Sequence, residues 1–321
     1  MTSIPTPRAD GSVAVVIPTY NRAELLRLTL ESVLAQTLPP AEVVVVDDGS
    51  TDSTAELLQE LAVSVIRNPD GGWGPGTARN AALEQVSSEY VAFLDSDDLL
   101  LPDALERLRD ALAAAPDAPF AFVRGLSARR EPDGWRQEGV IGPSEEEQRD
   151  LFGSLFVRNS VPASGGLVRT QVARRIGGYD PRVRWAEDHH FWIRAAMSGP
   201  PVHVPEIGCV YRRHAGNRYT PMLAEEDSDV ILELAAGDSR LESYVPERLG
   251  VELCLRSLSA IKARRPVRAA RYVFQHALMR PHRLRVLRSA VRHYRVRRRW
   301  WRVGRDVWSA RPDLREWLSA Y

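Results

Sequence analysis

Two stretches near the N-terminus decide the fold: Val13-Ala14-Val15-Val16-Ile17-Pro18-Thr19-Tyr20-Asn21-Arg22 and Glu42-Val43-Val44-Val45-Val46-Asp47-Asp48-Gly49-Ser50. Each stretch places β-branched apolar residues on successive positions and then turns polar. Strands that are buried on both faces, as in a parallel sheet, have this continuous apolar pattern. A helical pattern follows each stretch, over residues 22–36 and 50–61. The sequence therefore predicts that the chain begins with two βα units.

The same alternation continues for two more strands. Residues 63–67 and 90–94 have strand patterns, and residues 77–86 between them have a helical pattern. This order is typical of a parallel sheet with right-handed crossovers, so the fold class is α/β. Beyond a further helix at 102–115 the alternation weakens, and from Leu223 onward the pattern is helical and rich in arginine. We therefore expect an α/β domain at residues 1–222 and a basic α-helical C-terminal region at residues 223–321.

The composition is that of a globular protein with an ample core. The chain has 321 residues, of which 44% are hydrophobic and 26% are charged. Its apolar runs stay below the length that a transmembrane helix needs, and residues 1–12 lack the apolar centre of a signal peptide. The two cysteines, Cys209 and Cys254, form neither a disulfide framework nor a metal cluster. We expect a cytoplasmic protein.

Charge is distributed unevenly along the chain. Residues 251–321 contain 19 Lys and Arg against 4 Asp and Glu, whereas residues 1–250 contain 24 against 38. A basic tail of this kind can dock on the acidic part of its own chain, or it can lie on an anionic membrane surface. Binding to nucleic acid is the third interpretation and the weakest, since basic charge alone is a poor signal for it.

Acidic residues follow the predicted strands where these strands end. Asp47 and Asp48 follow the second strand, and Asp95, Asp97 and Asp98 follow the fourth. Asp47 and Asp48 could simply cap a helix beside a turn glycine. Three carboxylates within four residues, however, repel one another unless a cation is present, and Mg²⁺ or Mn²⁺ prefers oxygen ligands of this kind. In an open α/β sheet, ligands bind beyond the carboxyl ends of the strands.

Glycine-rich phosphate motifs do not explain these acids. The first strand is not followed by Gly-x-Gly-x-x-Gly, and the sequence has no Gly-x-x-x-x-Gly-Lys-Ser/Thr. The loop Gly71-Gly72-Trp73-Gly74-Pro75-Gly76 comes after the third strand, so a dehydrogenase is disfavoured. This loop either covers a nucleotide or is a plain surface loop.

Six segments, in order, resemble those of glycosyltransferase family 2. They are Val16-Ile17-Pro18-Thr19-Tyr20-Asn21-Arg22, Val46-Asp47-Asp48-Gly49-Ser50-Thr51-Asp52, Ala78-Arg79-Asn80, Phe93-Leu94-Asp95-Ser96-Asp97-Asp98, Gly177-Gly178-Tyr179-Asp180 and Glu187-Asp188. The resemblance covers roughly residues 12–215. It implies the GT-A fold, a Rossmann-like, mainly parallel sheet flanked by helices. It also implies an inverting, nonprocessive, metal-dependent enzyme that transfers a sugar from a nucleotide-sugar to an acceptor hydroxyl.

The resemblance also implies a nucleotide site. Pro18 and Tyr20 are expected to border the base, Asp48 to accept a hydrogen bond from its imide N–H, and Arg79 to reach the base or the phosphates. An imide favours uracil or thymine, so the donor is expected to be a UDP- or dTDP-sugar. Asp95 is placed either near the ribose or behind the metal ligands without touching the metal. The resemblance adds three further nucleotide-binding residues: Thr19, Arg22 and Ser96.

The same resemblance assigns the metal and the base. Asp97 is the expected ligand of Mn²⁺ or Mg²⁺, and His214 is a candidate to complete the metal site, the alternative being an exposed loop histidine. Inverting transfer needs a carboxylate that deprotonates the acceptor hydroxyl. Asp188 is the expected base, with Glu187 and Trp185 lining the sugar or acceptor pocket. Simple capping of the helix by Glu187 and Asp188 is the alternative.

The sequence leaves the acceptor, the sugar and the oligomeric state undetermined, and a homo-oligomer is possible. The competing hypothesis is a module that binds a nucleotide-sugar, an anionic membrane surface or nucleic acid without transferring anything. The basic C-terminal region is also compatible with peripheral contact with the inner face of a membrane. Nucleic acid is not an expected partner.

Overall fold

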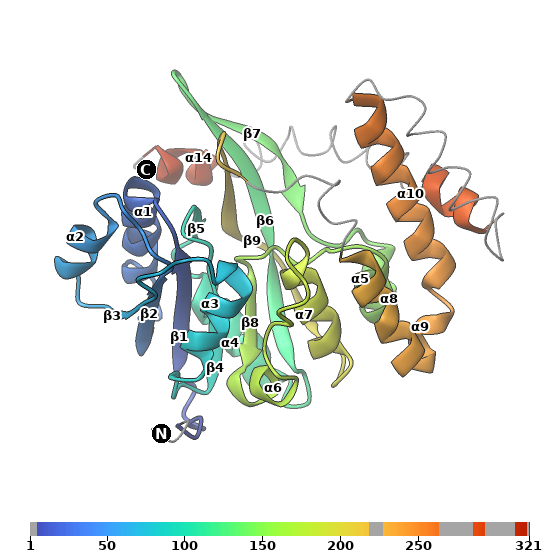
Figure 1. The fold of residues 1–321 in the computed structure, drawn as a ribbon, viewed down its shortest axis with the longest axis horizontal. Coiled ribbons are helices and arrows are strands. Elements are labelled where there is room, and N and C mark those ends of the chain that lie inside the picture. Colours follow the sequence, from blue (N-terminus) through green and yellow to red (C-terminus); the bar gives the residue numbers. More distant parts are fainter. Residues whose placement is uncertain (1–4, 218–226, 263–284, 293–311, 320) are drawn as a thin grey trace.

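A mixed sheet runs through the computed structural model of the protein, which describes residues 5–217, 227–262, 285–292, 312–319 and 321 (Figure 1). In these residues the sheet has nine strands in the order β3-β2-β1-β4-β8-β6-β9-β5, with β7 paired to β6. The strands are β1 (Val13–Thr19), β2 (Glu42–Asp47), β3 (Ser64–Arg67), β4 (Tyr90–Phe93), β5 (Asp98–Leu100), β6 (Phe120–Glu131), β7 (Gly134–Ile141), β8 (Gly166–Arg169) and β9 (Val202–Arg213).

Helices cover both faces of this sheet. They are α1 (Ala23–Leu34), α2 (Thr54–Gln59), α3 (Gly74–Leu83), α4 (Ala104–Ala114), the 3₁₀ helix η1 (Glu147–Asp150), α5 (Leu151–Val157), α6 (Thr170–Arg175), α7 (Glu187–Ala196), α8 (Ser228–Gly237), α9 (Ser239–Glu242), α10 (Val245–Lys262) and α14 (Pro312–Leu318). Of these, α8, α9 and α10 lie beyond α5 and α7 (Figure 1). The expected domain boundary at residues 222 and 223 lies outside the described residues.

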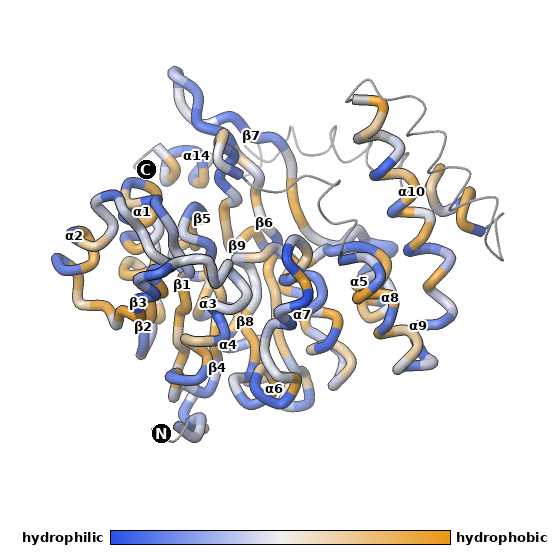
Figure 2. The backbone as a smooth tube through the Cα atoms, viewed as in Figure 1, coloured by the Kyte–Doolittle hydropathy of each residue, from blue (hydrophilic) through white to orange (hydrophobic). Residues whose placement is uncertain are grey.

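The sheet separates two apolar cores, and alternate residues of β1 face each of them. Val15 and Ile17 belong to the core that α1, α2 and α4 cover, whereas Ala14 and Val16 belong to the core under α3, α5, α6 and α7. Side chains alternate between the faces of a strand, so a strand buried on both sides must be apolar at every position. Figure 2 shows the central strands mostly in the orange of apolar residues.

The two halves of the sheet differ in strand direction. β1 is parallel to β2 and β4, and β2 is parallel to β3, as the βα alternation predicts. Beyond β4 the sheet is mixed, because β8 is antiparallel to both β4 and β6, while β6 and β9 are parallel. The carboxyl ends of β1, β2 and β4 therefore lie at one edge, beside the mixed half.

Several predicted elements differ from the structure in length. The strand expected at 161–169 begins only at Gly166, because a turn in which Gly165 N–H donates to the carbonyl of Pro162 (2.9 Å) precedes it. The helix expected at 77–86 begins earlier, at Gly74. The turn expected at 131–134 joins β6 to β7.

The C-terminal helices pack at two separate places. Ile231 and Ala235 of α8 share an apolar cluster with Phe156 and Ile193 beside α7. The last helix, α14, lies near α1 and β5 (Figure 1), where Leu314 and Leu318 pack against Leu99 and Val210. This end of the basic region therefore docks on the sheet, as one of the three interpretations predicted. Among the described residues, none of the helices combines the length and apolarity needed to cross a membrane.

Gly49, at the turn after β2, allows the loop that follows β3 to approach closely. Its φ of +83° lies in the left-handed region, and a Cβ at this position would come within 2.8 Å of the Cα of Gly71. Left-handed backbone costs a residue with a Cβ about 1–2 kcal/mol, and displacing packed backbone costs more.

We predict that Gly49→Ala lowers the free energy of unfolding by more than about 2 kcal/mol, as measured in urea. Gly72→Ala is the matched control, because Gly72 also has positive φ (+86°) but nothing within 4 Å of its added Cβ. The control should show only the backbone cost. Equal losses in the two variants would contradict the packing role of Gly49.

Candidate functional site

The polar ends of β1, β2 and β4 meet at one edge of the sheet. The N–H of Asn21, after β1, donates to the hydroxyl of Ser50 after β2 (2.9 Å), and the side-chain oxygen of Asn21 accepts from the N–H of Thr51 (2.7 Å). Arg22 then reaches the end of β4, where its Nη1 lies 2.6 Å from Oδ2 of Asp97. The structure therefore brings together three segments that the sequence separates by up to 75 residues.

Asp48 organises the glycine-rich loop. Its carboxylate accepts hydrogen bonds from Asn68 Nδ2 (2.7 Å), from the N–H of Trp73 (3.0 Å) and from the N–H of Gly74 (2.9 Å). Asp48 thus caps the start of α3 from a different segment of the chain. A carboxylate has about four lone-pair sites, so one remains for the N–H of a base. Tyr20, which is 46% exposed, follows Thr19, whose carbonyl accepts from the N–H of Asp48 (3.0 Å), and Trp73 is 39% exposed.

The three aspartates at the end of β4 have different partners. Asp95 pairs with Arg79, and Asp97 with Arg22 and His214. Asp98, fully buried, accepts a hydrogen bond from the hydroxyl of Ser164 (2.6 Å). Burial and the negative charges of its two neighbours raise the pKa of Asp98 well above its usual value, so the neutral form is favoured. Arg79 and Arg22 thus compensate the charges of Asp95 and Asp97, and Asp98 lies beside them in its neutral form.

Asp97 and His214 form the pair of side chains best suited to hold a cation. His214 Nε2 lies 2.9 Å from Asp97 Oδ2. Burial alone would raise the pKa of Asp97, but the hydrogen bond with His214 and the charges of Arg22 and Arg212 lower it below its usual value. The N–H of Gly216 donates to His214 Nδ1 (3.1 Å), so the ring proton is assigned to Nε2 and points at Asp97. A cation bound here would replace that proton.

The side chains at this site fit a cation whose coordination shell is completed by oxygen atoms of a substrate. In the described part of the chain, no three His, Cys, Asp or Glu side chains gather into a complete metal site. Mg²⁺ and Mn²⁺ commonly take one or two protein ligands and complete their shell with phosphate oxygens and water. Asp97 and His214 meet this requirement, although a bound cation must also displace the guanidinium of Arg22.

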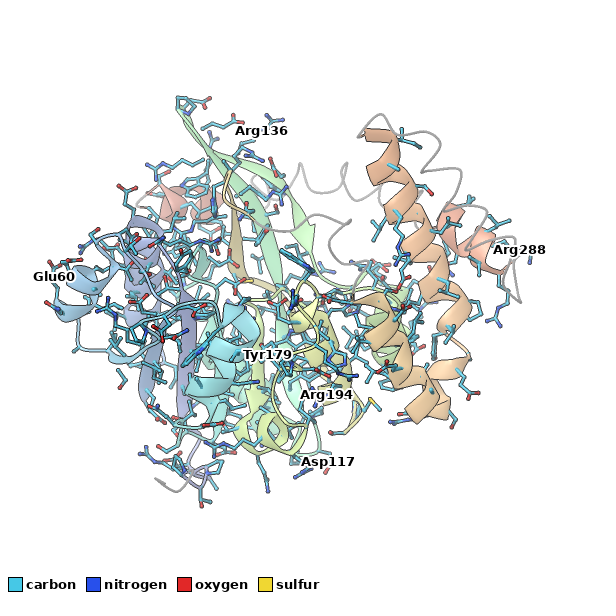
Figure 3. The ribbon with its side chains drawn as sticks, viewed as in Figure 1. Glu60, Asp117, Arg136, Tyr179, Arg194 and Arg288 are labelled. Carbon is cyan, nitrogen blue, oxygen red and sulfur yellow. The ribbon has the colours of Figure 1, made fainter. Side chains whose placement is uncertain are left out.

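Arg79 connects α3, the end of β4 and α7. Its guanidinium pairs with Asp95 and Glu187 and lies 5.0 Å from the ring centre of Tyr179, which Figure 3 labels. Arg79 is only 2% exposed and pairs with two carboxylates, so that it places Asp95 and Glu187 relative to each other. Its expected contact with the base or the phosphates stays a prediction.

Asp188 lies on the first turn of α7, next to Glu187. Its Oδ1 accepts from the N–H of His189 (2.7 Å) and its Oδ2 accepts from Asn159 Nδ2 (2.8 Å). Burial, together with the negative charge of Glu187, raises the pKa of Asp188 to about 7. A carboxylate with this pKa is well suited to accept a proton at neutral pH.

Sequence patterns missed several residues that support the site. Asp227 accepts hydrogen bonds from the N–H groups of Arg184, Trp185 and Ala186, and thereby fixes the start of α7. Its position at the start of a helical pattern was a capping signal, but nothing local links it to residues 41–43 positions away. Asn159 carried no signal. Tyr179 was part of a quoted motif without an assigned role.

Comparison with known proteins gives the family and the fold of this chain. Residues 14–164 match the family model described as "Glycosyl transferase family 2". The chain is 42% identical over 247 residues to an uncharacterized glycosyltransferase of Nostoc sp., which covers 74% of this chain and 75% of that protein. The chain belongs to glycosyl transferase family 2.

A second relative is larger. Poly(ribitol-phosphate) beta-N-acetylglucosaminyltransferase TarS of Staphylococcus aureus is 28% identical over 239 residues, which cover 70% of this chain but only 39% of TarS. The crystal structure of TarS 1–349 in complex with UDP-GlcNAc superimposes with a TM-score of 0.61 at 19% identity, over 91% of this chain and 92% of the other.

The mannosyltransferase PcManGT of Pyrobaculum calidifontis, in complex with GDP-Man and Mn²⁺, gives a TM-score of 0.50 at 22% identity, over 91% and 90% of the two chains. At these identities the structural likeness establishes the fold. The expected GT-A architecture with a helical C-terminal region is confirmed.

Proposed function

We propose that this protein is an inverting glycosyltransferase that moves a sugar from a UDP- or dTDP-sugar to an acceptor hydroxyl, with a divalent cation as cofactor. The observation that carries the proposal is that two groups of acids are linked. The first group follows β4 and includes Asp97, and the second, Glu187 and Asp188, lies at the start of α7. Arg79 joins the two groups through its ion pairs with Asp95 and Glu187.

The donor side is formed by the parallel half of the sheet. We assign Pro18, Thr19, Tyr20 and Asp48 to the base, with the one free lone pair of Asp48 available to an imide N–H. Asp95 and Ser96 would lie near the ribose, and Arg22 would reach the diphosphate once it leaves Asp97. The exposed aromatic side chains of Tyr20 and Trp73 support this assignment, because the backbone of Trp73 and that of Thr19, next to Tyr20, are hydrogen-bonded to Asp48.

The acceptor side is formed by α7. We assign Asp188 to take the proton of the acceptor hydroxyl while that oxygen attacks the anomeric carbon and the bond to the diphosphate breaks. Attack from the side opposite the leaving group inverts the anomeric centre. Glu187 and Trp185, which precede the base by one and three residues, are assigned to the sugar or acceptor pocket. A base within reach of the hydroxyl contributes about 10²–10⁴-fold to such a step.

Asp97 and His214 would hold Mn²⁺ or Mg²⁺. A bound cation supplies positive charge that stabilises the departing diphosphate. The protein's own part is to keep Asp97 ionised: its lowered pKa and its contacts with His214 and Arg22 maintain a negative charge where the cation would bind.

The remaining expectations about partners and location stay predictions. Contact between the basic helices and the inner face of a membrane concerns residues that lie largely outside the described ranges, as do many of the arginines. A cytoplasmic location, a homo-oligomer and the division at residue 222 are likewise predictions. TarS acts on poly(ribitol-phosphate) according to its name, but the acceptor of this chain is left open because the chain spans only 39% of TarS.

Cation binding tests the metal assignment without any substrate. Calorimetry with MnCl₂ should show binding to the unmodified protein and none to Asp97→Asn. Arg22→Ala should bind Mn²⁺ more tightly, because the guanidinium that competes for Asp97 is gone. Arg27→Ala is the matched control, since Arg27 lies on the same helix and pairs with the exposed Glu60 instead. Undiminished Mn²⁺ affinity in Asp97→Asn would exclude Asp97 as a ligand.

The pH dependence of turnover tests the base. Only ionised Asp188 can accept a proton, and its pKa is raised to about 7. The rate of UDP release from UDP-GlcNAc, with water or simple polyols as acceptors, should therefore fall about tenfold per pH unit below pH 7 and level off above it.

Substitution of the base gives the second half of this test. Asp188→Asn should lower the rate about 100-fold or more while retaining UDP affinity. Asp110→Asn, which changes an exposed aspartate paired with Arg109, is the control and should behave like the unmodified protein. Full turnover by Asp188→Asn, or a rate independent of pH between 5 and 8, would remove Asp188 from the role of base.

A further inference from the structure

The segment of residues 158–164, between α5 and β8, crosses the site from the base to the strand-end acids. Its first residue, Arg158, is held by Glu147 through two hydrogen bonds, Nε to Oε1 (2.9 Å) and Nη2 to Oε2 (2.7 Å). Its last residue, Ser164, donates to Asp98 Oδ2 (2.6 Å) and accepts from the N–H of Asp95 (3.1 Å). Both ends of the segment are therefore fixed.

Asn159, inside this segment, has an amide whose orientation is determined by its contacts. Its Oδ1 accepts from the N–H of Val161 (3.3 Å), so Oδ1 is the acceptor and Nδ2 the donor. Nδ2 donates to Asp188 Oδ2 at 2.8 Å. The other oxygen of Asp188 accepts from the N–H of His189 (2.7 Å). Both carboxylate oxygens are thus held in place while each keeps a further lone pair.

We propose that Asn159 is a positioning residue, which holds the carboxylate of Asp188 in a fixed orientation and favours its ionised form. This inference rests on the proposed role of Asp188 as the base. Because the segment that carries Asn159 is also bonded to Asp95 and Asp98, it sets the base relative to the acids on the donor side. Asn159 needs no contact with either substrate to act in this way.

Some of the groups around Asp188 raise its pKa and others lower it. Burial, Glu187 beside it on α7 and Asp95 at the end of β4 favour the neutral form, and the buried Tyr179 lies next to the same acids. Arg79 on α3 and the N–H of His189 favour the ionised form. The amide of Asn159 is a further donor that favours the ionised form, because a hydrogen bond to a carboxylate stabilises its charge.

The test compares Asn159→Ala and Asn159→Asp with Ser160→Ala. Ser160 is the matched control, because it is the next residue, is fully buried, and its hydroxyl has no hydrogen-bond partner among the described residues. The pKa of Asp188 is measured by ¹³C NMR of protein labelled at the aspartate carboxyl carbon, and its resonance is identified as the one missing in Asp188→Asn.

In Asn159→Ala the titration midpoint of Asp188 should rise by about one pH unit, because one donor to the charged form is lost. In Asn159→Asp, which keeps the shape of the side chain, the rise should be larger, because two carboxylates then share one site. kcat for UDP release from UDP-GlcNAc should fall in both variants with KM unchanged. The control variant should match the unmodified protein in all three quantities.

An unchanged midpoint in both Asn159 variants would overturn the inference, as would an equal shift in Ser160→Ala. Failure of the proposed function gives a different result. If the Asp188 midpoint shifts as expected but Asp188→Asn still turns over, Asn159 positions an acid that is not the base. If Asp188→Asn is inactive and the midpoint does not move, the function stands and the role of Asn159 fails.

Discussion

Concentrated negative charge at the end of β4 constrains this structure more than any other feature. Asp95, Asp97 and Asp98 lie within four residues, and an unpaired buried carboxylate is too costly to persist. Arg79 of α3 pairs with Asp95, and Arg22 at the start of α1 pairs with Asp97. Asp98 favours its neutral form and accepts a hydrogen bond from Ser164 before β8. Each of these contacts joins segments that are distant in sequence. The acids therefore hold the surrounding elements together as well as forming the site.

The same compensation links the two sides of the site. Arg79 neutralises Asp95 and also pairs with Glu187, so the start of α7 is tied to the end of β4 through one guanidinium. Asp188, one residue further, then lies in an environment crowded with charge, where burial and Glu187 raise its pKa to about 7. A group held near the working pH is what proton transfer requires. The ion pairs that neutralise the acids after β4 therefore also fix the surroundings of the carboxylate that we propose as the base.

The order of βα units and the edge at which the acids meet could be predicted from the sequence. Buried parallel strands need continuous apolar residues, and their carboxyl ends share one edge, so the polar residues that follow β1, β2 and β4 could be expected at the same edge of the sheet. The pairing beyond β4 could not be predicted, since antiparallel contacts such as β4 with β8 depend on tertiary packing rather than on local period. Residues 161–165 have an apolar start, and only Pro162 and Gly165 indicate that they form a turn.

Side-chain partners were harder to predict than positions. The resemblance assigned Arg79 to the nucleotide, and the structure buries its side chain on the same side of α3 as Leu83, four residues on. That helical spacing was a usable signal of burial. Asn159 gave no signal, because its contact with Asp188 joins residues 29 positions apart and its residue type is common in loops. Contacts of this kind depend on the path of the chain between elements.

The central claim is that acids from separate segments surround one cation and one diphosphate. Anomalous diffraction at the manganese edge, from crystals soaked with UDP and MnCl₂, tests it most directly. The account predicts a single strong peak in direct contact with Asp97, with the UDP diphosphate on its other side and the base beside Asp48. A peak remote from Asp97, or UDP bound without contact to the ends of β1 and β2, would contradict it.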